Sequence, residues 1–157
     1  MEFFFLFQRT YLSSWGAAVS GVKFDHDIEL VNSIDDIEYG DHIVFSSWLL
    51  HPRCHGIVVD KNEEENELLV IRFTYSDGVI EEWLPLKAPT YRVTKYYLGD
   101  KKLKSDCCSI DVVISRARAL KGSNKLRYNM TKNTCKTFAR WCKTGRIPAG
   151  VRGYDYE

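Results

Sequence analysis

Cys135 is the residue best placed for nucleophilic chemistry, because it lies where a loop turns into a helix. The sequence predicts a helix that Asn133 caps at its start and that Gly145 ends. The first turn of a helix has free backbone N–H groups and the positive end of the helix dipole, and both favour negative charge. Cysteines at such positions form the reactive thiolate more readily than free cysteine does.

The same helix also allows a structural role for this thiol. Four apolar side chains at helical spacing predict one stripe that faces a core: Cys135, Phe138, Ala139 and Cys142. Free cysteine is commonly buried, so the helix alone favours a structural thiol. Three cations flank the stripe and are expected to form a solvated face: Lys132, Lys136 and Arg140.

A thiol nucleophile needs an imidazole that takes its proton and returns one to the leaving group. The histidine that supplies it can lie far from Cys135 in sequence, because such pairs meet only in the folded chain. His42 follows Asp41 and is more typical of a structural hydrogen-bonding residue.

The middle of the chain predicts antiparallel strands, because β-branched and aromatic runs alternate with turn residues. The strands are expected over residues 42–45, 54–59, 68–75, 79–84 and 91–96, with an exposed acidic loop at 60–67. From residue 110 the apolar spacing becomes helical, and Arg116 is expected to point away from the core. Strands followed by two helices indicate an α+β domain, in which an antiparallel β-sheet meander packs against two C-terminal helices.

Composition predicts one globular domain over residues 1–157, since 45% of the residues are hydrophobic. Residues 1–35 lack a regular pattern and are expected to form an irregular N-terminal extension. The net charge of +1 gives no overall case for a nucleic-acid partner, because such partners are bound by an excess of basic charge. This overall charge does not exclude a local basic face that binds an anionic partner.

The five cysteines are odd in number and contain no C-x-x-C pair, so neither a disulfide framework nor a zinc finger is predicted. We expect no cofactor and no metal, although Cys54, His55 and the pair Cys107–Cys108 are a remaining zinc alternative. This cysteine usage favours a reducing, cytoplasmic compartment. The apolar residues 1–7 are too few to span a bilayer, because a membrane-spanning helix needs about 20 residues. They could instead pack on the core or make shallow contact with a membrane.

Five short motifs occur in a fixed order along the chain. They are Gly40 to Ile43, Cys54 to Val59, Val70 to Phe73, Val113 to Ala117, and Tyr128 to Gly145. Together they make the sequence resemble the lecithin–retinol acyltransferase-like family, a permuted branch of the papain-like thiol enzymes. The resemblance covers a motif-bearing core from about residue 38 to residue 145.

The resemblance implies a permuted papain-like fold with Cys135 as nucleophile and His55 as general base. Members of the family cleave an acyl ester of a glycerophospholipid, hold the acyl group as a thioester, and pass it to an acceptor or to water. The expectation is therefore a thiol-dependent acyltransferase or phospholipase A-type enzyme. Its expected partner is a phospholipid or membrane surface, reached from the cytoplasm by peripheral contact. The cations Lys132, Lys136 and Arg140 could then bind phospholipid head groups.

The sequence departs from the family at Arg72, where a second histidine usually orients the imidazole by accepting its other N–H. A guanidinium has no acceptor, so Arg72 cannot make that hydrogen bond. Thr74, on the same strand face, could occupy this third position, as could a backbone carbonyl, His42 or His51. Arg72 could also be a surface residue that pairs with the acidic loop.

Arg72 leaves a second function open, a catalytically silent module that keeps the fold and binds a lipid surface or a partner protein. A third alternative is a thiol peptidase on the same scaffold, because a fold alone does not fix the substrate.

Overall fold

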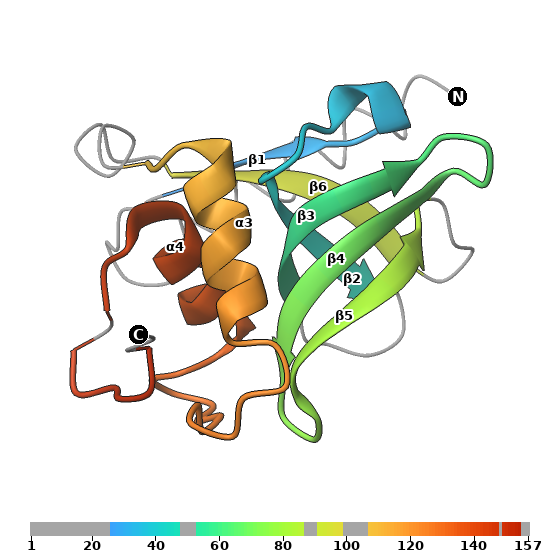
Figure 1. Ribbon diagram of the computed structural model, residues 1–157. Coiled ribbons are helices and arrows are strands. Elements are labelled where there is room, and N and C mark those ends of the chain that lie inside the picture. The colour runs from blue at the N-terminus through green and yellow to red at the C-terminus, as the bar shows by residue number, and fades with distance from the viewer. Residues whose placement is uncertain (1–25, 48–52, 87–90, 99–106, 148, 155–157) are drawn as a thin grey trace, which may run out of the picture.

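A six-stranded antiparallel sheet is the main element of the computed structural model, which describes residues 26–47, 53–86, 91–98, 107–147 and 149–154 (Figure 1). The strands are β1 His26–Leu30, β2 His42–Ser47, β3 Cys54–Asn62, β4 Glu67–Thr74, β5 Gly78–Pro85 and β6 Tyr91–Leu98. Their order in the sheet is β1-β6-β2-β3-β4-β5. A single 3-10 turn, η1 Ile34–Asp36, connects β1 to β2.

The strand prediction is confirmed for five of these strands, with small changes at their ends, and β2 to β5 form the expected meander. The expected irregular region needs correction, because residues 26–30 form β1 and pair with β6. The sequence of β1 alternates acidic and apolar residues, a pattern typical of a strand with one face in water. Residues 1–25 lie outside the described part of the chain.

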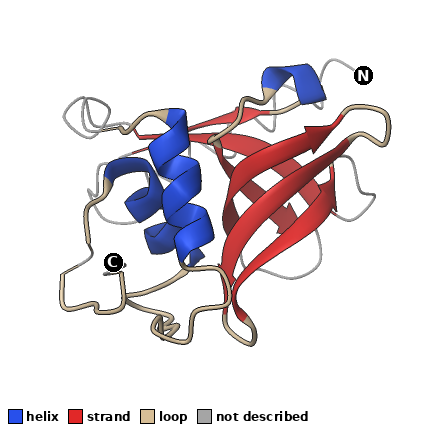
Figure 2. Cartoon of the chain, in the orientation of Figure 1, coloured by secondary structure: helices blue, strands red, loops and turns tan. Residues whose placement is uncertain are grey.

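The sheet is curved (Figure 2). Both of its faces bury apolar side chains. Successive residues of a strand point to opposite faces, and the two faces therefore belong to two cores. The inner core, within the curve, contains Val31, Ile34, Ile37, Ile43, Phe45, Val58, Leu68, Val70, Leu84, Leu86 and Val93. The outer core lies between the sheet and the helices and includes Ile57, Ile71 and Phe73.

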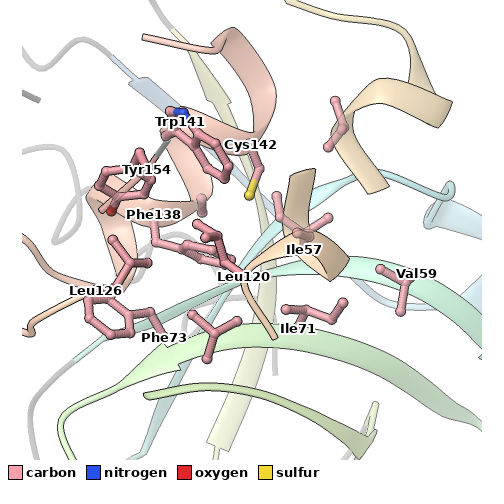
Figure 3. Packing of buried hydrophobic residues seen from close by; sticks show 14 residues of the cluster. Ile57, Val59, Ile71, Phe73, Leu120, Leu126, Phe138, Trp141, Cys142 and Tyr154 are labelled. Carbon is pink, nitrogen blue, oxygen red and sulfur yellow. The ribbon is translucent and has the colours of Figure 1, made fainter. Parts of the chain in front are cut away.

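Helices α3 Ile110–Ala119 and α4 Cys135–Thr144 cover the outer face, as the sequence predicts (Figure 1). α4 packs on β3 and β4, and α3 packs on α4. Phe138, Trp141 and Cys142 of α4 form one buried stripe within the outer core (Figure 3). Gly145 ends α4 in the left-handed conformation, with φ 70°, which glycine adopts without steric cost.

The expected outward orientation of Arg116 is wrong. Its guanidinium donates to the backbone carbonyl of Cys142 at 3.3 Å and to the thiol of Cys108 at 2.9 Å. Because α3 packs directly on α4, a long side chain on the edge of their contact reaches the end of the neighbouring helix. Arg116 therefore ties α3 to the C-terminal half of α4.

Candidate active site

Cys135 is the first residue of α4, but Asn133 is not its N-cap. Thr134 occupies the N-cap position, and its backbone N–H donates to the Thr137 hydroxyl at 2.7 Å. This reciprocal arrangement is a capping box, in which the third helical residue supports the cap. The sequence pattern located the helix start to within one residue.

Asn133 instead holds the loop before Cys135. Its side chain is 1% exposed, donates to the carbonyl of Arg127 at 2.9 Å and accepts from the Tyr154 hydroxyl at 2.6 Å. The backbone N–H of Asn133 also donates to the carbonyl of Asn129 at 2.9 Å, which closes a tight turn over residues 129–133. A buried amide with both of its ends bonded fixes this turn, and with it the start of α4.

The sulfur of Cys135 lies against the first residues of β3. It accepts the backbone N–H of His55 at 3.4 Å, and the thiol donates to the carbonyl of Arg53 at 3.7 Å. Cys135 is half-buried, whereas Cys142, on the same helical stripe, is fully buried in the outer core. A backbone N–H directed at the sulfur stabilises negative charge on it. The sulfur is therefore placed at the edge of the core, next to His55.

His55 and His42 form a buried pair on the outer face of the sheet. Nε2 of His42 and Nδ1 of His55 are 2.8 Å apart, and the two side chains are 2% and 6% exposed. The register places Val44 opposite His55 and His42 opposite Ile57, so the two imidazoles are diagonal neighbours across β2 and β3. Diagonal neighbours are close enough for ring side chains to touch.

Burial lowers the pKa of His42 well below its usual value of 6.5, and the neighbouring His55, Lys143, Lys136 and Arg140 lower it further. His42 is therefore neutral at neutral pH. A neutral imidazole with its proton on Nδ1 accepts through Nε2, and Nε2 of His42 is the atom that meets His55. When His55 donates from Nδ1, its own Nε2 is left as a base.

This buried pair predicts a stability that falls in acid. The folded-state pKa of His42 lies below its unfolded value of 6.5, so below about pH 6.5 the unfolded chain binds a proton that the folded chain does not. The free energy of unfolding should fall by up to about 1.4 kcal/mol per pH unit, until the folded-state pKa is reached. Urea unfolding between pH 7 and pH 5 measures this slope. His42→Gln should have a flatter slope, and an unchanged slope would contradict this assignment.

Arg72 and Thr74, the expected third-position residues, point to the other face of the sheet. The Arg72 guanidinium donates to Glu82 and lies 5.8 Å from the centre of the Phe45 ring, which belongs to the inner core. The Thr74 hydroxyl donates to the carbonyl of Gly78 at 3.0 Å and accepts from the N–H of Asp77, within the β4–β5 turn. The imidazole nitrogen that meets Nδ1 of His55 belongs to His42 on β2.

Gly56 allows β3 and β4 to approach closely beside His55. A Cβ at this position would lie 2.4 Å from Cγ1 of Val70 and 3.2 Å from the carbonyl oxygen of Ile71. Only glycine fits at such a distance, which explains a glycine directly after the histidine. The close packing fixes the backbone that presents His55 to Cys135.

Tyr128 is a site residue that the sequence interpretation missed. Its ring packs on Phe73, with centroids 5.0 Å apart, and its hydroxyl is within hydrogen-bonding reach of the backbone and thiol of Cys135. Partial burial, together with the nearby Cys135 and Cys54 thiols, raises the pKa of Tyr128. The phenol therefore stays protonated and can donate a hydrogen bond. Its place in the motif before Cys135 was the available signal.

The three expected head-group residues do not form one cluster. Lys132 is exposed in the turn before Cys135, whereas Lys136 and Arg140 are half-buried on α4, close enough to His42 to lower its pKa. His51 lies outside the described residues. Within the part of the chain that the structure describes, histidine, cysteine and carboxylate side chains form no group that could hold a metal ion.

A comparison with models of known protein families identifies the family of this chain. A model of the lecithin retinol acyltransferase family matches residues 35–148, which is well over half of the chain. The chain belongs to this family. Members of the lecithin retinol acyltransferase family are generally Cys/His thiol acyltransferases or phospholipases of lipid metabolism. No curated protein and no solved structure is significantly similar to the chain.

The matched residues include all five motifs of the sequence resemblance, whereas β1 precedes the match. The six-stranded sheet with two C-terminal helices is the fold expected for a lecithin retinol acyltransferase domain. Among the described helices, neither is long and apolar enough to cross a bilayer.

Proposed function

We propose that this protein is a thiol-dependent acyltransferase or phospholipase A-type enzyme that takes an acyl group from a glycerophospholipid. Cys135 is the nucleophile, His55 the general base, and His42 the residue that orients the imidazole of His55. The observation that carries the proposal is the 2.8 Å contact between His42 and His55. This pair lies beside the Cys135 sulfur, which accepts a hydrogen bond from the backbone N–H of His55. The site acts on lipid from the cytoplasmic side, without a cofactor.

The first half of the reaction transfers the acyl group to sulfur. His55 takes the thiol proton on Nε2, and the Cys135 thiolate attacks the ester carbonyl carbon. The backbone N–H of Cys135 and the Tyr128 hydroxyl donate hydrogen bonds to the oxyanion that forms. The ester C–O bond then breaks, and His55 gives its proton to the departing lysophospholipid oxygen.

The second half of the reaction repeats these roles. His55 removes a proton from water or from an acceptor, whose oxygen or nitrogen attacks the thioester carbonyl. The C–S bond breaks and the sulfur takes the proton back. His42 accepts the Nδ1–H of His55 throughout, which stabilises the imidazolium that forms twice in each cycle.

The test is intact mass measurement after incubation with a short-chain phosphatidylcholine, with free fatty acid measured in the same sample. An acyl-sized mass gain, or fatty acid release, is expected from the wild-type protein. If a folded protein gives neither, the proposal fails and the catalytically silent module becomes the better interpretation. Measuring both products is necessary because fast hydrolysis would remove the adduct.

Arg72 should be dispensable for catalysis, because its side chain lies on the inner face with Glu82. Arg72→Ala is expected to keep kcat/KM within about threefold of wild type and to lower stability by less than about 1 kcal/mol. Initial rates on the short-chain lipid and thermal unfolding measure the two effects. A loss of activity in a variant that stays folded would show that Arg72 takes part in catalysis. Arg72→His is the informative companion, and we expect no gain from it, since an imidazole there also points away from His55.

A further inference from the structure

Charge is strongly segregated along this nearly neutral chain. Residues 112–154 contain eleven basic side chains and no acidic one, whereas residues 27–82 contain fourteen acidic side chains and three basic ones. The basic segment forms α3, α4 and the loops around them, and the acidic segment forms most of the sheet. We call residues 112–154 the basic layer. Cys135 belongs to the basic layer, and Lys132 and Lys136 lie close to it in the sequence.

The two ends of β4 differ in charge, since three exposed glutamates precede β4 whereas Asp77 is the one acidic residue of the turn that follows it. β4 follows the exposed acidic turn of residues 63–65 and ends at Thr74, next to Tyr75. Its eight residues separate these ends by roughly 25 Å. Figure 1 shows the β3–β4 turn at one end, and the β4–β5 turn beside the loop after α3 at the other. The acidic turn therefore faces away from the loop that leads to Cys135.

Two apolar side chains project at the end that carries Cys135. Met130 is 80% exposed and Tyr75 is 79% exposed. Tyr75 packs edge-on against Tyr128, with ring centroids 5.9 Å apart, and the Tyr128 hydroxyl reaches Cys135. Tyr75 is thus linked to Cys135 through Tyr128, and Met130 lies two residues after Tyr128 in the same loop.

The turn that presents Met130 is held rigidly and is flanked by cations. The side-chain oxygen of Asn129 accepts the backbone N–H groups of Thr131 at 2.9 Å and of Lys132 at 3.2 Å. Arg127 and Lys132 are exposed on either side of Met130. A preformed turn loses little entropy when it binds, so an exposed methionine at its tip is suited to insertion into another surface.

We propose that this end of the molecule docks on an anionic phospholipid bilayer. Met130 and Tyr75 enter the interface, and Arg127 and Lys132 contact lipid phosphates beside them. A thioether gains nothing from a phosphate backbone but does gain by entering the acyl boundary, which favours a bilayer over a nucleic acid. The inference rests on the proposed function, because docking in this orientation brings Cys135 to a lipid ester.

Vesicle co-sedimentation of the full chain tests the docking without any need for catalysis. Binding is expected to vesicles of equal parts phosphatidylcholine and phosphatidylglycerol, to fall with added salt, and to be much weaker on phosphatidylcholine alone. Lys132→Gln should weaken binding roughly fivefold, which corresponds to one cation near an anionic surface. Met130→Ser should weaken binding by a similar factor.

Two matched variants control for charge and for exposed apolar area. Asn62→Asp makes the same change of net charge at the acidic end, where the new carboxylate can still accept the N–H of Glu65. Trp83→Ser removes another exposed apolar side chain, from the half of β5 that pairs with the start of β4. Both controls should bind like wild type. If they weaken binding as much as Lys132→Gln and Met130→Ser do, the assigned face is wrong.

The docking proposal and the proposed function fail in different ways. Turnover of a dissolved short-chain lipid without binding to anionic vesicles would overturn the docking face and leave the function intact. Vesicle binding with the expected variant pattern, but without acyl transfer, would support the face and reject the function. Binding to a duplex RNA oligomer in place of vesicles would overturn the lipid assignment of the basic layer.

Discussion

Cys135→Ala is expected to lower acyl transfer by about 10⁴-fold or more, and to abolish the acyl-sized mass gain, because no other group can form the thioester. The loss should occur in a folded protein. Cys135 is half-buried at the edge of the outer core, and alanine is a good residue for the first turn of a helix. Circular dichroism and thermal unfolding verify folding, and the short-chain lipid assay measures the loss.

Cys54→Ala is the matched control for this loss. Cys54 is the residue before His55 on β3 and is half-buried, but it packs against the inner core on the other face of the sheet. Acyl transfer by this variant should stay close to that of wild type. Full activity in Cys135→Ala, or equal losses in both variants, would remove Cys135 from the mechanism.

His42→Ala is expected to lower kcat/KM by about 10²- to 10³-fold, which is the range of a misdirected acid–base catalyst. Without His42, Nδ1 of His55 loses an acceptor that holds its tautomer and ring orientation. His42→Gln should recover part of the activity, because a side-chain amide oxygen can also accept a hydrogen bond. The pH dependence of kcat/KM is the decisive measurement, since a positioning residue changes the apparent pKa of the base.

Ile43→Ala separates positioning from mere destabilisation. Ile43 is the next residue on β2, is fully buried, and faces the inner core, so its truncation should cost about 2–5 kcal/mol of stability. At a temperature where the variant stays folded, its pH profile should match that of wild type. If His42→Ala changes the profile no more than Ile43→Ala does, then His42 has only a structural role.

The sequence predicted best those features that depend on the spacing of neighbouring residues. The strands β2 to β6, both helices and the placement of Cys135 in a first helical turn all depend on short-range spacing, and the structure confirms them. β1 was missed because its five residues are acidic at alternate positions and resemble a solvated loop. Five residues give too few alternations to distinguish such a strand from a loop.

The third site residue depends on information that local pattern does not contain. His42 meets His55 diagonally, and this contact follows from the register between β2 and β3 rather than from either segment alone. Arg72 was the natural candidate because it occupies the position of the family's histidine. Whether it shares a face with His55 depends on the pairing of β4, and that pairing puts Arg72 inside the curve of the sheet.

Tyr154 has a consequence for where this domain ends as a working unit. The family match ends at residue 148 and the recognisable motifs end at Gly145. The Tyr154 hydroxyl nevertheless donates to the buried amide oxygen of Asn133, and its ring packs at a tilt against Trp141, with centroids 4.8 Å apart. At the other end, β1 begins at His26, before the matched residues. A shortened version of the domain must therefore keep both β1 and the segment up to Tyr154. A fragment that contains only the motifs would lose the hydrogen bond from Tyr154 to Asn133, which holds the loop before Cys135.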